Sequence, residues 1–259
     1  MNYTLKEQGK FKYIDEGEGE VLLLLHGLFG ALSNWKDVIE RFSGKYKVVI
    51  PMMPIYDMPL LTTSVKGLAK FIEEFVEEMG FTKMTVLGNS LGGHVALVYS
   101  LNNQHNIHSM VLTGSSGLYE NAMGGSYPKR GDYEYMKKKV EYTFYDPATA
   151  TKELVDEVFE ITNDRMKVLK TLAMAKSAIR HNMRKDISKI KVPVCLIWGK
   201  DDKITPPEVA EEFLQLLPKA ELHWVDKCGH APMMEQSAAF NEILDDFLTR
   251  MYSKTTIAQ

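Results

Sequence analysis

Short, wholly apolar runs alternate along this chain with longer segments in which apolar residues recur at helical spacing. Residues 21–25 and 48–50 carry apolar side chains only, as expected of strands that are covered on both faces of a sheet. Residues 64–79 instead place apolar side chains three and four positions apart, with glutamates between them, and Gly80 follows as a stop signal. This alternation predicts an α/β fold with a mostly parallel central sheet flanked by helices.

One long segment interrupts the alternation. Strand patterns disappear between residues 118 and 188, where a loop containing glycine and proline precedes three helical segments, and they resume at residue 192. We therefore predict a core formed by residues 1–117 and 189–259, with a helical insertion formed by residues 118–188.

Ser90 is the first candidate for chemistry, because it lies in Gly88-Asn89-Ser90-Leu91-Gly92 between a predicted strand and a predicted helix. A sharp strand-to-helix turn requires small residues two positions on either side of the serine. Such a turn exposes the hydroxyl, and the N–H groups that begin the helix stabilise negative charge beside it. The spacing predicts a nucleophilic serine.

Two groups that can activate Ser90 follow at the ends of later predicted strands. Asp201 and Asp202 come after the strand at residues 192–199, and His230 comes after the next strand. A nucleophilic serine needs a base to take its proton, and the base needs a carboxylate to hold its tautomer. Unrelated folds that carry a serine triad have its residues in different orders along the chain, and the order serine, aspartate, histidine is typical of one of these folds.

Taken together, these motifs resemble those of α/β-hydrolases that carry a helical cap, over nearly the full length of the chain. The matching segments are residues 25–30, 88–93, 197–202 and 229–232. The resemblance implies that the insertion is the cap. It also implies that Asp202, the third residue after the glycine that ends its strand, is the triad acid, with Asp201 as the alternative.

The resemblance further implies an oxyanion hole made by the backbone N–H groups of Leu28 and Leu91. His26, two residues before Leu28, is expected to be a structural residue of its turn. We expect a largely apolar substrate pocket, because the cap is rich in aromatic residues. The residues expected to line it are Phe29, Asn89, Tyr127 and Met174.

Two other segments are interpreted more simply. The run Lys137-Lys138-Lys139 is expected to be a solvated helix face. Residues 51–57 form an apolar loop stiffened by prolines where the family usually has an acidic residue and a glycine-rich turn, and we expect this loop to alter the pocket at its rim.

Composition narrows the choice of partners. The 259 residues carry a formal net charge of -3, which gives no reason to expect nucleic acid. No apolar run approaches the roughly 20 residues of a membrane span, and no export segment precedes the first strand, so we expect a cytoplasmic protein with a small-molecule substrate and no membrane contact. With 2 cysteines, neither a disulfide framework nor a zinc site is expected, and no metal or cofactor is predicted. The oligomeric state stays open.

Hydrolysis of a small carboxylic ester through an acyl-enzyme is the leading functional prediction. An alternative is a carbon–carbon hydrolase of the meta-cleavage-product type, because Asn89 precedes the serine in a motif similar to theirs. Those enzymes usually have a cap arginine and a tryptophan after the triad histidine, whereas Ala231 stands here and only Arg165 and Arg180 are candidate substitutes. A third alternative is a non-enzymatic small-ligand receptor on the same fold.

Overall fold

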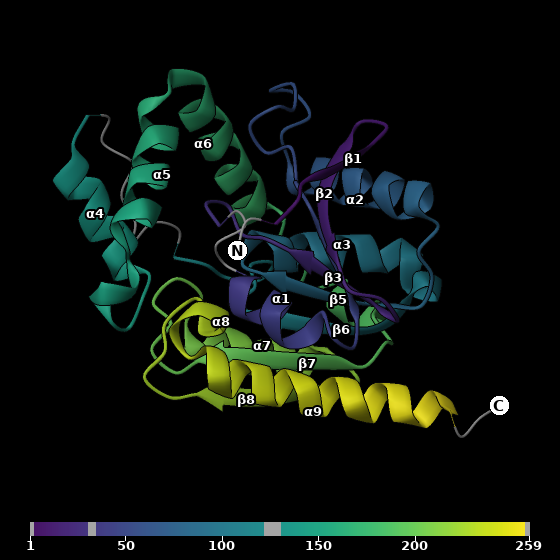
Figure 1. The fold of residues 1–259 in the computed structure, drawn as a ribbon. Helices are drawn as coiled ribbons and strands as arrows, with labels where there is room; N and C mark the ends of the chain where they lie inside the picture. Colours follow the sequence, from purple (N-terminus) through teal and green to yellow (C-terminus); the bar gives the residue numbers. More distant parts are fainter. Residues whose placement is uncertain (1–2, 31–34, 122–130, 257–259) are drawn as a thin grey trace.

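The computed structural model describes residues 3–30, 35–121 and 131–256, and its centre is an eight-stranded sheet (Figure 1). The strand order is β1-β2-β4-β3-β5-β6-β7-β8. β1 and β2 pair antiparallel at one edge, and the strands from β4 to β8 are parallel to one another. The strands are β1 (Lys6–Gln8), β2 (Phe11–Glu16), β3 (Val21–Leu25), β4 (Lys47–Pro51), β5 (Met84–Asn89), β6 (Ile107–Thr113), β7 (Val194–Gly199) and β8 (Ala220–Val225).

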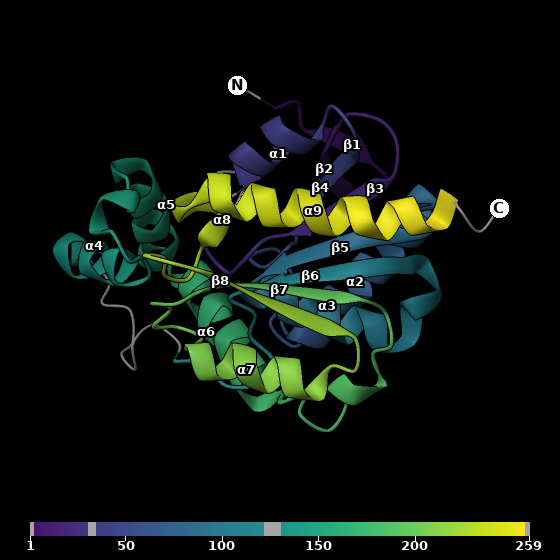
Figure 2. The same ribbon diagram turned by 90° about the horizontal axis from the view of Figure 1, so that it is seen from below.

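Helices cover both faces of this sheet, as the alternating pattern predicts. Figure 2 shows α1 and α9 on one face, with α2, α3 and α7 on the other. No helix in the described ranges is both long and apolar enough to cross a bilayer. The helices are α1 (Lys36–Phe42), α2 (Val65–Met79), α3 (Leu91–Asn103), α4 (Tyr133–Tyr142), α5 (Lys152–Asn163), α6 (Arg165–Arg180), α7 (Pro207–Leu216), α8 (Pro232–Glu235) and α9 (Ser237–Thr256), with short 3-10 turns at Gln104–Asn106, Pro147–Thr149 and Ile187–Lys189.

Strand β3 shows why a wholly apolar run becomes a central strand. Successive side chains of a strand point to opposite faces, so each face of the sheet receives every second residue. Leu23 and Leu25 belong to the core beneath α2, α3 and α7, whereas Leu22 and Leu24 belong to the core beneath α1 and α9. All four leucines have no exposed surface, which requires helices on both sides.

Helix α2 begins and ends where its sequence signals place it. The Ser64 hydroxyl accepts a hydrogen bond from the Gly67 N–H at 3.0 Å, which satisfies one of the free donors of the first turn. Gly80 ends the helix in the left-handed conformation with a φ of 65°. The amphipathic segment therefore forms a helix that is capped at both ends and packs against the sheet.

Between β6 and β7 the chain forms α4, α5 and α6, which Figure 1 shows grouped beside one end of the sheet. Backbone and side-chain bonds tie this group to the rest of the chain. The Val65 N–H donates to the Ser177 hydroxyl at 3.1 Å, and the Lys170 ammonium donates to the Tyr56 carbonyl at 2.6 Å. The His230 N–H donates to the Thr143 carbonyl, just after α4, at 3.1 Å.

Candidate active site

Ser90 occupies the turn between β5 and α3, and its backbone is held in an unusual conformation. Its φ of 53° and ψ of -118° lie in a region that L-residues rarely adopt. A Cβ placed on Gly92 would lie 2.0 Å from the Leu25 carbonyl oxygen, and one on Gly88 would lie 2.6 Å from the backbone of Gly92. Both glycines are therefore needed for β3, β5 and α3 to approach this closely.

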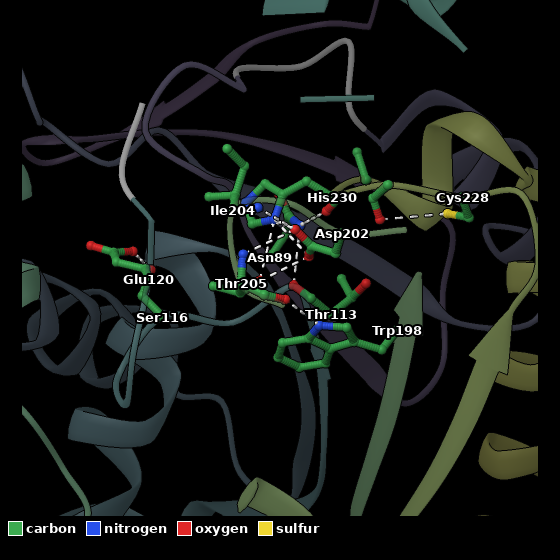
Figure 3. A network of polar contacts seen from close by, with 12 residues as sticks. Asn89, Thr113, Ser116, Glu120, Trp198, Asp202, Ile204, Thr205, Cys228 and His230 are labelled. Atoms are coloured by element: carbon green, nitrogen blue, oxygen red, sulfur yellow. Dashed lines mark hydrogen bonds and ion pairs between the residues drawn. The ribbon is translucent and has the colours of Figure 1, made fainter. Parts of the chain in front are cut away.

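His230 and Asp202 form a buried pair at the ends of β8 and β7 (Figure 3). The His230 Nδ1 lies 2.9 Å from the Asp202 Oδ2, and the two residues are 7% and 3% exposed. Asp201 is exposed, and its N–H donates to the Cys228 carbonyl. The arrangement brings together the two residues that the motif spacing selects and separates the alternative aspartate from the histidine.

The carboxylate of Asp202 is held by its own loop as well as by His230. Its Oδ1 accepts hydrogen bonds from the N–H groups of Ile204 at 2.8 Å and Thr205 at 2.9 Å, and its Oδ2 accepts one from the Thr205 hydroxyl at 2.8 Å. The Trp198 indole N–H in turn donates to the Thr205 carbonyl at 2.8 Å. These bonds fix the orientation of the carboxylate toward the imidazole.

Electrostatics in this pair favour a more basic histidine. Burial by itself lowers the pKa of His230, but the charge of Asp202 and its hydrogen bond outweigh burial, so the net pKa is raised above its usual value. A histidine of this kind can accept a proton and hold the resulting charge against its carboxylate partner.

Ser90 and His230 line one pocket, together with most of the residues predicted for it. Asn89 is 3% exposed, and its amide donates to the carbonyls of Thr113 at 3.1 Å and His230 at 3.3 Å, so it also ties the strand of the serine to the loop of the histidine. The predicted residues that line the pocket are Leu28, Phe29, Asn89, Ser90, Leu91, Met174 and His230. Tyr127 lies outside the described residues.

The two backbone donors predicted for an oxyanion hole stand at neighbouring turns. Leu91 is the first residue of α3, and N–H groups of a first helical turn have no partner within the helix. Leu28 follows β3, where its carbonyl accepts a hydrogen bond from the Tyr56 hydroxyl at 2.8 Å. His26 accepts from the Met53 N–H at 3.2 Å through its Nε2, which is the structural role expected of it.

The loop at residues 51–57 does not line the pocket, although we expected it at the pocket rim. None of its residues is among the described residues that line the pocket, and Met53 and Ile55 are buried in the core instead. The loop reaches the pocket only indirectly, through the bond from Tyr56 to Leu28. Its physical effect is to brace the turn that carries Leu28.

The lysine run on α4 also departs from expectation at one position. Lys137 and Lys138 are exposed, as predicted for a solvated face, but Lys139 is half-buried and lines the pocket. Arg165 and Arg180, the candidate carboxylate ligands, are exposed and are not among the described pocket-lining residues. Among the described residues, the lysine or arginine that lines the pocket is therefore Lys139 of α4.

Sequence reasoning missed two carboxylates near the site. Glu235 of α8 accepts hydrogen bonds from the N–H groups of Gly229 at 3.0 Å, Ala231 at 3.2 Å and Tyr145 at 2.7 Å, so it shapes the His230 loop. Glu120 lines the pocket itself. Neither belongs to a motif, and only the proximity of Glu235 to His230 in sequence offered a signal.

Cys195, Glu221 and His223 have potential metal-ligand atoms within 4.8 Å of one another on β7 and β8. Glu221 already forms an ion pair with Arg250, whose Nη1 donates a hydrogen bond to the Glu221 Oε2 at 3.0 Å. Burial raises the pKa of the Cys195 thiol, which keeps it protonated. An adjacent guanidinium and a protonated thiol both disfavour a bound cation, so ion pairing accounts for this cluster.

The fold and the arrangement of the site agree with a family assignment. The sequence model of the α/β hydrolase fold family matches residues 20–237, and the chain belongs to that family. It is an enzyme with hydrolase activity, as its relatives are.

Three proteins that are similar to this chain along nearly its whole length are known. A 2-hydroxy-6-oxononadienedioate/2-hydroxy-6-oxononatrienedioate hydrolase of Paraburkholderia phymatum is 30% identical, over 91% of this chain and 90% of its own. A hydrolase of the same name from a Pseudomonas species is 26% identical, over 95% of this chain and 99% of its own. The crystal structure of MGS-MChE2, an α/β hydrolase enzyme from the metagenome of lagoon sediments at Mar Chica, Morocco, is 47% identical with a TM-score of 0.79, covering 95% and 98% of the two chains.

Proposed function

We propose that this protein is a serine hydrolase that cleaves small, mainly apolar carboxylic esters through an acyl-enzyme. Ser90 is the nucleophile, His230 is the general base and Asp202 orients the imidazole. The observation that supports this most directly is the buried His230–Asp202 pair, 2.9 Å apart, whose histidine lines the same pocket as a serine on a strained strand-to-helix turn. In a serine triad the histidine takes the proton of the serine and the carboxylate orients the histidine.

The proposed reaction has two steps, which are the formation and the hydrolysis of an acyl-enzyme at Ser90. The Ser90 Oγ attacks the ester carbonyl carbon while its proton passes to His230, and the N–H groups of Leu28 and Leu91 stabilise the oxyanion. Collapse of the intermediate expels the alcohol, which takes the proton from His230. Water then repeats the sequence on the acyl-enzyme and releases the carboxylic acid.

The lining of the pocket favours an ester over a substrate rich in carboxylates. Most lining residues are apolar, including Met136, Val140 and Phe144 from the segment around α4. No arginine is found among the described lining residues, and the small Ala231 follows the histidine. An apolar acyl or alcohol group gains from burial against such a surface.

Carbon–carbon hydrolysis is the second candidate, and two observations favour it. Relatives that align along nearly the whole chain carry names of dienedioate and trienedioate hydrolases. Lys139 also lines the pocket, where its ammonium could pair with a substrate carboxylate. In this case the same serine site would act on a carbon–carbon bond next to a ketone.

We also infer that residues 118–188 act as a cap over the site. The pocket is lined on one side by residues after β3 and β5, such as Phe29 and Ser90, and on the other by residues of α4, α5 and α6, such as Val158 and Met174. A substrate between these two surfaces is shielded from water, which strengthens the electrostatic interactions of the reaction.

Activity-based labelling tests the proposal. The purified protein should react at Ser90 with an alkyl fluorophosphonate and should turn over para-nitrophenyl esters many times. The Ser90→Ala variant should lose labelling and turnover while keeping its circular dichroism spectrum, because only the attacking oxygen is removed.

Two comparisons separate the alternatives. A parallel assay with a vinylogous 1,5-diketone acid distinguishes carbon–carbon from ester hydrolysis by the higher kcat/KM. Multiple turnover of either substrate excludes a ligand receptor. Labelling of another serine, such as Ser115 or Ser116, would contradict the assignment of the nucleophile.

A further inference from the structure

Glu120 places a carboxylate in the pocket of Ser90 and His230, and it is the only acidic residue among the described residues that line it. The Ser116 hydroxyl donates a hydrogen bond to the Glu120 Oε2, and Figure 3 shows the two side chains together. The next residue is fixed as well, because the Asn121 N–H donates to the Ile204 carbonyl at 2.6 Å. The carboxylate is therefore held in place in the loop after β6.

The surroundings of this carboxylate are mainly apolar. Leu28, Met174 and Ile204 line the same pocket, and burial raises the pKa of Glu120, while its hydrogen bond from Ser116 and the nearby His230 oppose that rise. A carboxylate with little water around it interacts strongly with any charge placed in the same space.

Among the described residues that line the pocket, Lys139 is the only lysine or arginine, and its ammonium lies near the aromatic side chains of its own helix. The Lys139 Nζ is 5.6 Å from the ring centroid of Tyr135 and 6.0 Å from that of Tyr142, whose side chain is exposed. The charged group that acts on the pKa of Glu120 is His230 rather than Lys139.

We propose that Glu120 determines the charge specificity of the pocket, favouring uncharged substrates and penalising those that carry a carboxylate at the end of the bound chain. The proposal rests on the hydrolase function proposed above and narrows its substrate class to neutral esters. It predicts that this chain disfavours the doubly charged acids that the names of its dienedioate-hydrolase relatives describe.

A matched pair of esters tests the role of Glu120. Para-nitrophenyl hexanoate and mono-para-nitrophenyl adipate differ only in that a terminal methyl group is replaced by a carboxylate. The parent enzyme should prefer the hexanoate in kcat/KM after subtraction of the uncatalysed rate. In Glu120→Gln this preference should shrink by about tenfold, mainly through a lower KM for the adipate, because the amide keeps the shape and removes the charge.

Ser116→Ala is the matched control, because it removes the hydrogen bond to Glu120 but keeps the carboxylate group, and the bond from the Asn121 N–H to the Ile204 carbonyl still restrains the loop. This variant should retain the preference for the hexanoate. Equal losses on both esters in Glu120→Gln, or an unchanged ratio between them, would overturn the proposal, since a purely structural residue would affect both substrates alike.

Covalent labelling keeps this test separate from the test of ester hydrolysis. Two alkyl fluorophosphonates of equal length, one with a terminal carboxylate, report the same charge discrimination through their rates of reaction with Ser90. If neither ester is turned over but Glu120→Gln raises the relative rate of the anionic probe about tenfold, ester hydrolysis fails and the role of Glu120 stands. An unchanged ratio of labelling rates refutes that role.

Discussion

The two adjacent aspartates after β7 show how much depends on a single position. Asp202 is buried and faces the His230 Nδ1, whereas Asp201 is exposed and contributes its backbone N–H to the Cys228 carbonyl. Consecutive residues in an extended segment point in different directions, so only one of them can reach the imidazole.

We expect Asp202→Asn to lower kcat/KM by about 10⁴-fold. Replacing the triad aspartate of a serine protease by asparagine causes a loss of this size. The amide cannot stabilise the imidazolium, and it can donate a hydrogen bond to Nδ1, which would leave the imidazole in the wrong tautomer. Steady-state kinetics on a para-nitrophenyl ester measure the loss, with circular dichroism as the check on folding.

The matched variant is Asp201→Asn, which changes the same chemical group one residue earlier. Its kcat/KM should stay within a few-fold of the parent value, because an exposed side chain makes no contact with His230. An inactive Asp201→Asn with an active Asp202→Asn would contradict the assignment of the acid.

Prediction from sequence at the scale of single residues was possible where local spacing places a residue at the end of a strand. Ser90, Asp202 and His230 each follow a strand at a short offset, and they lie at the same edge of the sheet because parallel strands end there. Their catalytic roles stay predictions. Glu120 and Lys139 could not be found in this way, because their positions in the pocket depend on how the loop after β6 and helix α4 pack, and no motif marks either residue.

At the scale of elements, the junction of β3, β5 and α3 depends on the absence of side chains. Gly92 lies so close to the Leu25 carbonyl that even a methyl group would meet backbone rather than a movable side chain. The close approach is what allows the helix to begin directly after the serine.

We expect Gly92→Ala to destabilise the fold by roughly 3 kcal/mol or more, because the overlap can be relieved only by moving a strand or a helix. The control is Gly44→Ala, where an added Cβ meets nothing within 4 Å and the stability should change by less than about 0.5 kcal/mol. Urea unfolding of both variants measures the difference. A Gly92→Ala protein as stable as the parent would show that the junction is looser than this geometry implies.

The elements themselves were largely predictable. Hydrophobic patterns predicted the strands at β3, β4, β5, β7 and β8 and the helix at α2, and the structure confirms an α/β hydrolase fold with a mostly parallel sheet. The course of residues 51–57 was not predictable, because it is set by bonds to distant groups, from Met53 to His26 and from Tyr56 to Leu28. Periodicity contains no information about such long-range loop contacts.

At the scale of the whole molecule, a pair of histidines joins the core to the helices between β6 and β7. The His94 Nε2 in α3 lies 3.1 Å from the Nδ1 of His181, which follows α6, and the two rings are stacked. His94 has no exposed surface, and burial together with the nearby His181 lowers the pKa of His94 to about 3.

This pair predicts that acid weakens the folded state. Because the pKa of His94 is lower in the folded protein than in the unfolded chain, where it is near 6.5, the unfolded chain binds the extra proton between these values. The contribution of His94 to stability is therefore complete above about pH 6.5 and is lost progressively as the pH falls toward 3.

We expect His94→Gln to reduce the steepness with which the free energy of unfolding falls between about pH 6.5 and pH 4.5. Urea titrations of the parent and the variant across this range give the two slopes. His105→Gln is a suitable control, since His105 is exposed and its removal should leave the slope of the parent unchanged. Identical slopes for the parent and His94→Gln would contradict the expectation.

The bond from the His230 N–H to the Thr143 carbonyl has a consequence for how such enzymes diversify. On the neighbouring side of the same loop, Glu235 of α8 accepts from the Tyr145 N–H, so the residues just after α4 touch the histidine loop through backbone groups. Backbone contacts tolerate many changes of side chain but few changes of path. The helices between β6 and β7 are therefore free to acquire new pocket-facing residues, whereas a transplanted or shortened segment would have to reproduce the course of the chain at Thr143 and Tyr145.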